Sequence, residues 1–335
     1  MSSRPLVSIG MPVHNADRHL RDALDSLLAQ DYRNLEIVIS DNASSDSTEA
    51  ICSEYARRDD RVTYHRLDEN QGAVSNFNRV FALAHGTYFM WAAHDDVRAP
   101  RFVSCCVDAM EKRPDAGLCC SEVAFIDEEG KPVEPWTALH HPTGATARAR
   151  LSAIVRSRFW LDVYGLIRSE VLATTTLAQP VWGFDVSILL QLCLRGPVLF
   201  VPEPLFHYRV DPAKSTRGVA DTLGAAAVPG RISVSWTGLV LALARDVREA
   251  PLGALQRALL AVQLMIQMCV FNGIVGSGIR KELGRSFGEA WSGRRWGRLA
   301  VLVLMAAMVL PVHNRLVRSV VRTARRQGGP PRGDV

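Results

Sequence analysis

Short apolar runs alternate with amphipathic stretches over the first part of the chain. The apolar runs are rich in β-branched and aromatic side chains and predict strands at residues 6–11, 35–39, 62–66 and 88–92. Between them, apolar side chains recur every three or four positions, which predicts helices at residues 17–30, 46–58, 73–85 and 100–112. Strands separated by helices of this length predict βαβ units and a mostly parallel, Rossmann-like α/β sheet flanked by helices.

The pattern is less regular in the middle of the chain. We expect a hairpin turn at residues 127–130, a loop at residues 134–147 and a helix at residues 185–194. Three short strands are predicted, and Pro202 and Pro204 separate the last two. These strands are residues 163–167, 199–201 and 205–208.

From about residue 222 the chain is rich in apolar helical stretches, notably residues 255–275. Residues 299–312 form a run of 14 without charge, which is shorter than the ~20 residues of a membrane-spanning helix. On a helix of residues 315–327, arginines and aliphatic side chains occupy opposite arcs, as in helices that lie on anionic lipid. The alternative is a helix packed on the protein's own body. Residues 328–335 are predicted to be a disordered tail.

The net charge of +5 is unevenly distributed. Residues 280–335 contain 12 Lys or Arg against 3 Asp or Glu, and the rest of the chain is mildly acidic. A basic segment with interspersed apolar residues and no aromatic platform favours an anionic membrane surface over nucleic acid as its partner. The polar N-terminus lacks the regions of a signal peptide. We therefore expect a cytoplasmic protein, peripheral at the cytoplasmic face of a membrane.

Apolar residues make up 48% of the chain and charged residues 22%, which is typical of a globular protein. Seven cysteines are present, including the adjacent pairs Cys105-Cys106 and Cys119-Cys120. No CxxC motif occurs, so neither a zinc knuckle nor a disulfide framework is indicated. We expect reduced thiols in the core.

Polar clusters follow three of the predicted strands. They are His14-Asn15, residues 41–46 and residues 94–96. Because the carboxyl ends of parallel strands meet at one edge of a sheet, these clusters predict a single site. The ring of His14 is suited to stacking on a nucleobase, and Asp41 to accepting a hydrogen bond from a base N–H. The other interpretation of residues 41–46 is a turn that starts a helix.

Asp95 and Asp96 are adjacent carboxylates that repel each other unless a cation neutralises them. Such oxygen ligands suit Mg²⁺ or Mn²⁺ bound to two phosphates; the alternative is a solvated acidic turn. Asp185 opens a helix and is either its cap or a general base. Further along, His207 or Asp211 is suited to completing a metal shell, and Arg209 or Lys214 to neutralising phosphate.

The order of these motifs resembles glycosyltransferase family 2, whose members have the GT-A fold. The matching text is VSIGMPVHN at 7–15, SLLAQ at 26–30, EIVISDNASSDST at 36–48, NQG at 70–72, Asn78 and AHGTY at 84–88. The resemblance continues more weakly to about residue 215. It implies a GT-A domain at residues 1–221, with an α-helical C-terminal region at residues 222–335.

Within that domain, the resemblance implies a nucleotide-binding half (residues 1–98) and an acceptor half (residues 99–221). The implied nucleotide-sugar ligands are Pro12, His14, Asn15, Asp41, Asn42, Asn78 and Asp95. The implied metal ligands, for Mn²⁺ or Mg²⁺, are Asp95, Asp96, His207 and Asp211, and the implied general base is Asp185. The sequence departs from the family pattern at Ala93 and Phe184, where the family usually has carboxylates, and at Asp211, where it often has histidine.

The resulting prediction is an inverting, metal-dependent transferase. It would move a sugar from a nucleotide-sugar donor to a saccharide or lipid-linked acceptor, and a UDP-sugar is the expected donor. The expected process is the synthesis of a cell-surface polysaccharide or a glycolipid. One alternative is a nucleotidyltransferase, although residues 11–15 lack the Gly-rich basic loop of that class. Another is a catalytically degenerate carbohydrate-binding or nucleotide-binding scaffold, which Ala93 and Phe184 leave open. A dinucleotide oxidoreductase is disfavoured because no GxGxxG follows the first strand.

Overall fold

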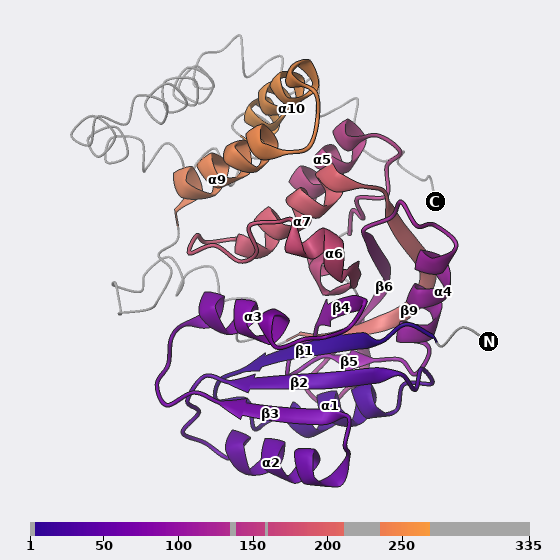
Figure 1. Cartoon of the computed structure of the whole chain (residues 1–335), viewed down its shortest axis with the longest axis vertical. Helices are drawn as coiled ribbons and strands as arrows, with labels where there is room; N and C mark the ends of the chain where they lie inside the picture. The colour runs from indigo at the N-terminus through magenta and orange to yellow at the C-terminus, as the bar shows by residue number, and fades with distance from the viewer. Residues whose placement is uncertain (1–3, 135–138, 158–159, 211–234, 269–335) are drawn as a thin grey trace, which may run out of the picture. The chain divides into compact units, whose positions relative to one another are not determined.

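The computed structural model describes residues 4–134, 139–157, 160–210 and 235–268. The chain divides into two compact units, residues 1–234 and residues 235–335, and each is described by itself (Figure 1).

The first unit is built on a single sheet. Its described strands follow the order β3-β2-β1-β4-β8-β6-β9-β5, and β7 pairs with β6 beside this path. The strands are β1 (Val7–Val13), β2 (Leu35–Asp41), β3 (Val62–Arg66), β4 (Tyr88–Trp91), β5 (Val97–Arg98), β6 (Leu118–Ile126), β7 (Pro132–Val133), β8 (Leu166–Arg168) and β9 (Val198–Arg209). The four strands at one end, β3-β2-β1-β4, are mutually parallel, and β6 pairs parallel with β9.

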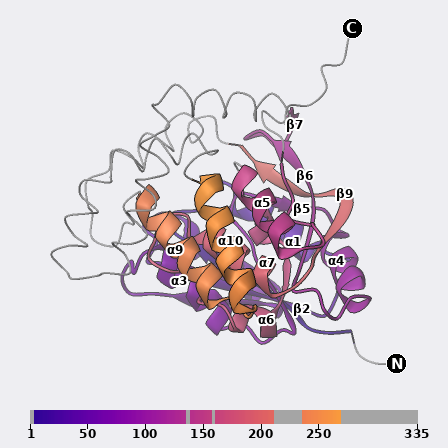
Figure 2. The ribbon, with the colours of Figure 1, turned by 90° about the horizontal axis from the view of Figure 1, so that it is seen from above.

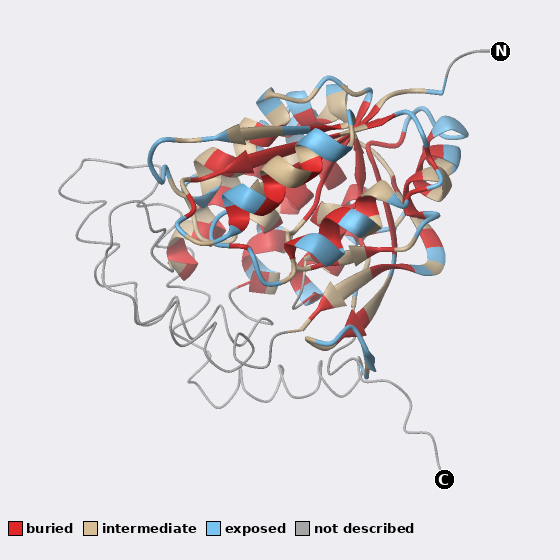
Figure 3. Ribbon diagram, turned by 90° about the horizontal axis from the view of Figure 1, so that it is seen from below, coloured by how far each residue is buried: buried red, intermediate tan, exposed pale blue. Residues whose placement is uncertain are grey.

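Helices cover this sheet. They are α1 (Leu20–Leu28), α2 (Thr48–Arg58), α3 (Ala73–Ala82), α4 (Phe102–Glu111), α5 (Ala147–Arg156), α6 (Ser169–Ala173) and α7 (Phe184–Arg195), with the 3-10 helix η1 (Leu161–Tyr164). In Figure 1, α3 lies on one side of the parallel strands, and α1 and α2 lie on the other. The central strands are almost wholly buried, whereas the helices expose their outer faces (Figure 3).

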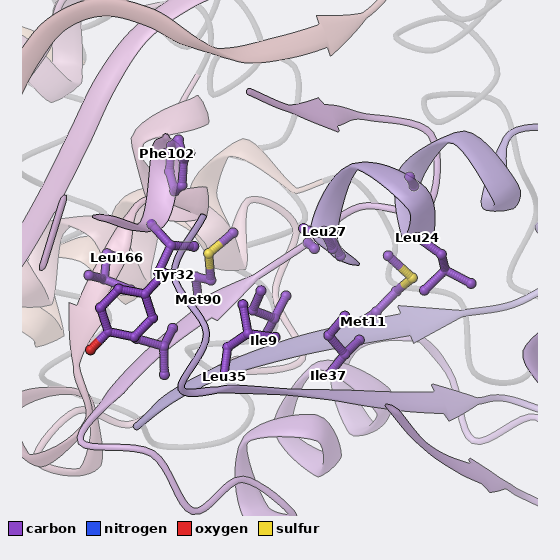
Figure 4. Close-up of a cluster of buried hydrophobic side chains, with 14 of the residues drawn as sticks. Ile9, Met11, Leu24, Leu27, Tyr32, Leu35, Ile37, Met90, Phe102 and Leu166 are labelled. Atoms are coloured by element: carbon purple, nitrogen blue, oxygen red, sulfur yellow. The ribbon is translucent and has the colours of Figure 1, made fainter. Parts of the chain in front are cut away.

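Alternate side chains of the parallel strands enter different layers. Ile9 and Ile37 point into the core with Leu24 and Leu27 of α1 (Figure 4). Gly10 faces the opposite layer, where an added Cβ would lie 2.7 Å from the Phe89 ring. A strand buried on both faces reads as a continuous apolar run, and this explains why the pattern identified these strands.

The eight helices and strands predicted up to residue 112 are confirmed, as are the 127–130 hairpin turn and the helix from residue 185. The strand predicted at 163–167 is wrong in its first half: η1 occupies that part, and β8 begins only at Leu166. The two strands predicted around Pro202 and Pro204 are one strand, β9. The β6–β9 register shifts opposite these prolines, and such an irregularity tolerates a residue that has no N–H to donate.

The described part of the second unit is a pair of packed helices, α9 (Trp236–Glu249) and α10 (Ala254–Ile266) (Figure 2). One face of α10 carries four exposed apolar side chains, Leu255, Leu259, Val262 and Ile266. Within the described ranges, none of the helices is long and apolar enough to cross a membrane. Residues 299–312 and 315–327, for which an apolar run and a basic amphipathic helix are predicted, lie outside the described residues.

Candidate active site

The loops that follow β1 and β2 are joined by hydrogen bonds to side chains. The N–H of Asn15 donates to Ser44 Oγ at 2.9 Å, and Asn15 Oδ1 accepts from the N–H of Ser45 at 2.9 Å. Asn15 and Ala43 have left-handed backbone conformations, with φ of 50° and 59°. Asparagine visits this region readily, but alanine is strained there. The first two polar clusters therefore form one unit at the carboxyl edge of the sheet.

A cavity of about 200 Å³ borders this unit. The loop after β1 and the turn after β4 line it, together with two residues from later in the chain. The lining residues are Asn15, Ala16, Arg18, His19, His94, Asp95, Glu128 and Arg209. The polar clusters after the first and fourth strands thus meet at one cavity, which Asp95 borders.

Arg209 holds the walls of this cavity together. Its guanidinium is buried and donates to the carbonyl oxygens of Asp95 (2.8 Å), Asp127 (3.0 Å) and Glu128 (2.7 Å). Its backbone N–H donates to Asp96 Oδ1 at 2.9 Å. Asp96 is only 4% exposed, so this bond fixes the second carboxylate of the pair. Arg209 therefore braces the β4–β5 turn against the β6–β7 hairpin while it borders the cavity.

The carboxylates after β4 suit a hard divalent cation. Asp95 and Glu128 line the cavity, and the buried Asp96 follows Asp95 in the chain; carboxylate oxygen ligands fit Mg²⁺ or Mn²⁺. The ring of His207 instead contacts the carbonyl oxygen of Pro204, with Nε2 at 3.1 Å, and does not line this cavity. Asp211 and Lys214 lie outside the described residues.

Asp41 is fully buried at the end of β2. Its carboxylate accepts from the N–H and the hydroxyl of Ser44, at 2.9 and 2.6 Å, and from the Tyr64 hydroxyl at 2.7 Å. Burial and the neighbouring Asp41 charge raise the pKa of Tyr64 well above its usual range, so Tyr64 stays a donor. Arg66 Nε also lies 3.8 Å from Asp41 Oδ2, so Asp41 holds the loop after β2 together from within the protein.

Asn70 connects the other predicted base-binding residues. Asn70 Oδ1 accepts from Asn42 Nδ2 at 2.8 Å, and Asn70 Nδ2 lies 3.1 Å from Nε2 of the exposed His14 ring. The oxygen of Asn42 accepts from the N–H of Gln71. Pro12 is half-buried in β1, beside Ser40 of β2. His14 and Asn42 are thus hydrogen-bonded to the NQG loop, residues 70–72. Sequence analysis had assigned no chemical role to this loop.

Asn78 has a different environment. Its side chain exchanges two hydrogen bonds of 2.9 Å with the backbone of Ala178, across 100 residues of sequence. These bonds fasten α3 to the segment before α7. Asn78 does not line the cavity at Asp95.

Asp185 lies in the first turn of α7, after Gly183, whose φ of 75° is left-handed. A second cavity, of about 220 Å³, is lined by Asp185 and four aromatic side chains, which are Phe77, Tyr164, Trp182 and Phe184. Burial raises the pKa of Asp185. A carboxylate with a raised pKa is a stronger base than an exposed one, so this position combines a proton acceptor with an apolar pocket.

Tyr164, at the end of η1, connects the two sides of the site. It lines the Asp185 pocket, and burial together with the charges of Asp185, Asp96 and Asp95 raises its pKa. These carboxylates from two distant stretches of sequence therefore act on one hydroxyl. Sequence analysis missed Tyr164, since it lies within the segment interpreted as a strand, residues 163–167, and belongs to no motif.

Sequence analysis also missed Arg18 and Glu128, which form an ion pair at the cavity. Glu128 belongs to the segment interpreted only as a hairpin turn. His19 lies beside them, and burial, with the nearby charges of Arg209 and Arg18, lowers its pKa. A neutral His19 leaves the arginines as the positive charges at this wall.

Comparisons with known proteins bear on the family and the fold of the chain. Residues 8–165 match the model of the family described as Glycosyl transferase family 2. Among curated proteins, the chain is similar to the uncharacterized glycosyltransferase RP339 of Rickettsia prowazekii. The two are 39% identical over 108 residues, which are 32% of this chain and 33% of that protein. The chain thus spans about a third of the length of that relative.

Two solved structures show the shared fold. S. aureus TarS 1–349 in complex with UDP-GlcNAc has a TM-score of 0.61 at 14% identity, over 98% of this chain and 94% of that one. The mannosyltransferase PcManGT from Pyrobaculum calidifontis, in complex with GDP-Man and Mn²⁺, has a TM-score of 0.54 at 16% identity, over 92% and 88% of the two chains. At these identities the likeness concerns the GT-A fold alone.

Proposed function

We propose that this chain, which belongs to glycosyltransferase family 2 through residues 8–165, transfers a sugar from a nucleotide-sugar donor to an acceptor hydroxyl with inversion. The observation that carries the proposal is the placement of two carboxylate residues: Asp95 lines the cavity at the carboxyl edge of the sheet, and Asp185 lines an aromatic pocket together with Tyr164. The donor is proposed to bind at the first cavity and the acceptor at Asp185.

The donor is assigned to residues 1–98, and a UDP-sugar is the first candidate. TarS, which shares the fold, was crystallised with UDP-GlcNAc, and PcManGT with GDP-Man and Mn²⁺. In this chain, His14 is exposed beside the buried acceptor Asp41, so a base that stacks on the ring has a carboxylate near its edge. Asn15 and Asp95 face the cavity next to them. Pro12, Asn42 and Asn78 are proposed to shape this half.

Asp95 and Asp96 would hold Mn²⁺ or Mg²⁺, with His207 and Asp211 as proposed additional ligands. When bound, the cation would neutralise the charge of the departing nucleoside diphosphate. Arg18 borders the same cavity, where its positive charge would add to that neutralisation.

The acceptor is assigned to residues 99–221, with Asp185 as the base. The Asp185 carboxylate accepts the proton of the acceptor hydroxyl, and the oxygen bonds to the anomeric carbon. The bond from that carbon to the diphosphate breaks on the opposite face, so the configuration inverts. The aromatic side chains around Asp185 suit the apolar face of a sugar ring, which supports a saccharide or lipid-linked acceptor.

Association with a membrane is a further part of the proposal. The exposed apolar face of α10 supports contact with a bilayer surface, and the basic sequence after residue 280 supports an anionic one. An acceptor that carries a lipid would place the reaction at the cytoplasmic face, in cell-surface polysaccharide or glycolipid synthesis.

Calorimetric binding of UDP, GDP and TDP, each with Mn²⁺ and with EDTA, tests the donor site first. We expect one nucleotide to bind tightly only with metal, and Asp95→Ala/Asp96→Ala to abolish that binding. Asp115→Ala is the matched control, since Asp115 is an exposed carboxylate paired with Arg113 that lines neither the cavity at Asp95 nor the pocket at Asp185. If the folded wild-type chain binds none of the three nucleotides, the transferase is excluded in favour of a non-catalytic scaffold.

A further inference from the structure

Three side chains with metal-binding atoms meet away from the proposed donor and acceptor sites. They are Cys120 on β6, His141 in the loop before α5 and Asp162 in η1. Their ligand atoms all lie within 4.8 Å of one another, and His141 Nδ1 is 2.7 Å from Asp162 Oδ1. None of the three lines the cavity at Asp95 or the pocket at Asp185. The fold therefore gathers a second cluster from segments that are distant in sequence.

The cluster is enclosed. Cys120 is 3% exposed and Asp162 is 7% exposed. A carboxylate taken out of water costs free energy unless it is paired or binds a cation. His141 is the least buried of the three, with 19% of its side chain exposed. Its ring packs on Phe200, with centroids 4.4 Å apart, and this contact fixes the ring against β9.

The atom types differ from those of the donor site. Cys120 offers sulfur, His141 nitrogen and Asp162 oxygen, which is a ligand set that Zn²⁺ accepts and that Mg²⁺ does not. Zn²⁺ bonds of about 2.0 to 2.3 Å put tetrahedral ligand atoms roughly 3.5 Å apart. The His141–Asp162 pair must therefore open by less than about 1 Å to admit the ion.

Space for a fourth ligand borders the cluster. A small void of about 10 Å³ is lined by Cys120 and Asp162, among others. This is about the smallest volume that holds one water molecule. Three protein ligands and one water would complete a tetrahedral shell.

We propose that Cys120, His141 and Asp162 form a Zn²⁺ site that joins β6, the loop before α5 and η1. The ion would be structural in effect, because it would fix η1, and Tyr164 at the end of η1 borders the Asp185 pocket. The site is independent of the cation proposed at Asp95 and Asp96, and a protein that binds both would hold two metals of different character.

Spectroscopic titration of the full chain with Co²⁺, after removal of bound metal with a chelator, tests the site. Tetrahedral Co²⁺ with a thiolate ligand gives intense visible bands and a thiolate-to-metal charge-transfer band. We expect one equivalent to produce these bands and Zn²⁺ to abolish them by displacement. Asp95→Ala/Asp96→Ala should retain them, because oxygen ligands alone produce neither feature. Absence of a charge-transfer band in the folded wild-type chain would overturn the proposal.

Variants assign the ligands. Cys120→Ser should lose the charge-transfer band, whereas Cys105→Ser, at a half-buried free thiol on α4, should keep it. His141→Gln alters the most exposed ligand, so it tests the site even if Cys120→Ser fails to fold; we expect its Co²⁺ affinity to fall at least about tenfold. An unchanged spectrum and affinity in His141→Gln would place the metal at another thiol and overturn the assignment.

Discussion

At the scale of single residues, the proton affinity of Asp185 is set by its aromatic surroundings. Burial raises its pKa, and the proposed reaction needs the ionised carboxylate. The rate should therefore rise with pH through the raised pKa and become constant above it. Asp185→Asn keeps the shape but removes the acceptor, so we expect kcat to fall by about 10²- to 10⁴-fold. Initial rates with Mn²⁺, measured over the pH range in which the protein is folded, check both statements.

The same pKa shift has a consequence for stability. The folded chain retains a proton on Asp185 that the unfolded chain has already released. The free energy of unfolding therefore falls as pH rises between the unfolded and folded pKa values, and Asp185→Asn removes this contribution. Asp115→Asn, at an exposed carboxylate paired with Arg113, is the control for the rate and should leave the pH profile of the rate unchanged. A wild-type rate in Asp185→Asn would exclude Asp185 as the base.

Replacement of Arg209 should weaken the donor site by disrupting the hydrogen bonds that hold its walls together. Its buried guanidinium makes three hydrogen bonds to carbonyl oxygens, and lysine cannot reproduce this fork. We expect Arg209→Lys to lower the free energy of unfolding by about 2 to 3 kcal/mol and to raise the donor KM. Urea unfolding and initial rates measure the two effects.

The matched control for Arg209→Lys is Arg21→Lys. Arg21 forms an exposed ion pair with Glu54, and exposed pairs contribute little. We expect this control to leave stability and KM nearly unchanged. Equal stability of the two variants would show that the Arg209 fork does not hold the site together.

The candidate residues that sequence analysis found belong to local motifs. Asp95, for example, directly follows an apolar strand, and this residue lines a cavity. Tyr164, Arg18 and Glu128 were missed because their positions depend on contacts between distant segments, as in the Arg18–Glu128 pair that spans 110 residues. A pattern with a period of two or 3.6 residues carries no information about such contacts.

At the scale of helices and strands, too, local patterns were predictable and contacts between distant segments were not. The strands β1, β2 and β4 were predictable because both of their faces are buried. By contrast, β6 was missed: it is apolar at each end, but Glu122 in its middle is exposed. The prolines of β9 were interpreted as a break, although a register shift accommodates them. Here pairing with neighbouring strands overrides local propensity.

The turn that starts α7 makes a testable contribution to Asp185. Gly183 has a φ of 75°, and a side chain there costs about 1 to 2 kcal/mol in the left-handed region. We expect Gly183→Ala to lower the free energy of unfolding by about that amount. Relief of the strain would also displace Asp185 two positions later, so kcat should fall. Thermal unfolding and initial rates measure these effects.

Gly253→Ala is the control for this substitution. Gly253 precedes α10 with a φ of −62°, and an added Cβ would meet nothing within 4 Å. We expect a change of less than about 0.5 kcal/mol, since alanine adopts this conformation without strain. If Gly183→Ala is equally well tolerated, the left-handed turn does not limit the position of Asp185.

At the scale of the whole molecule, charge and apolar surface are concentrated in the C-terminal part of the chain. Residues 280–335 carry 12 basic against 3 acidic residues. The apolar face of α10 spans three turns at spacings of four, three and four residues, and Leu255 and Leu259 are 75% and 63% exposed. Apolar contact and positive charge are the two interactions that hold peripheral proteins on anionic bilayers. A test of the membrane proposal must therefore vary the apolar contact and the electrostatic attraction separately.

Sedimentation of the full chain with vesicles provides that test. We expect binding to vesicles that contain phosphatidylserine, weaker binding to pure phosphatidylcholine, and loss of the difference at high salt, because screening removes the electrostatic part. Leu255→Gln/Leu259→Gln should weaken binding at least about tenfold, since each leucine contributes about 1 to 2 kcal/mol on transfer from water. Gln256→Ser, at an exposed polar position of the same helix, should bind as the wild type does. Undiminished binding by the double variant would confine the membrane contact to the basic sequence and remove α10 from it.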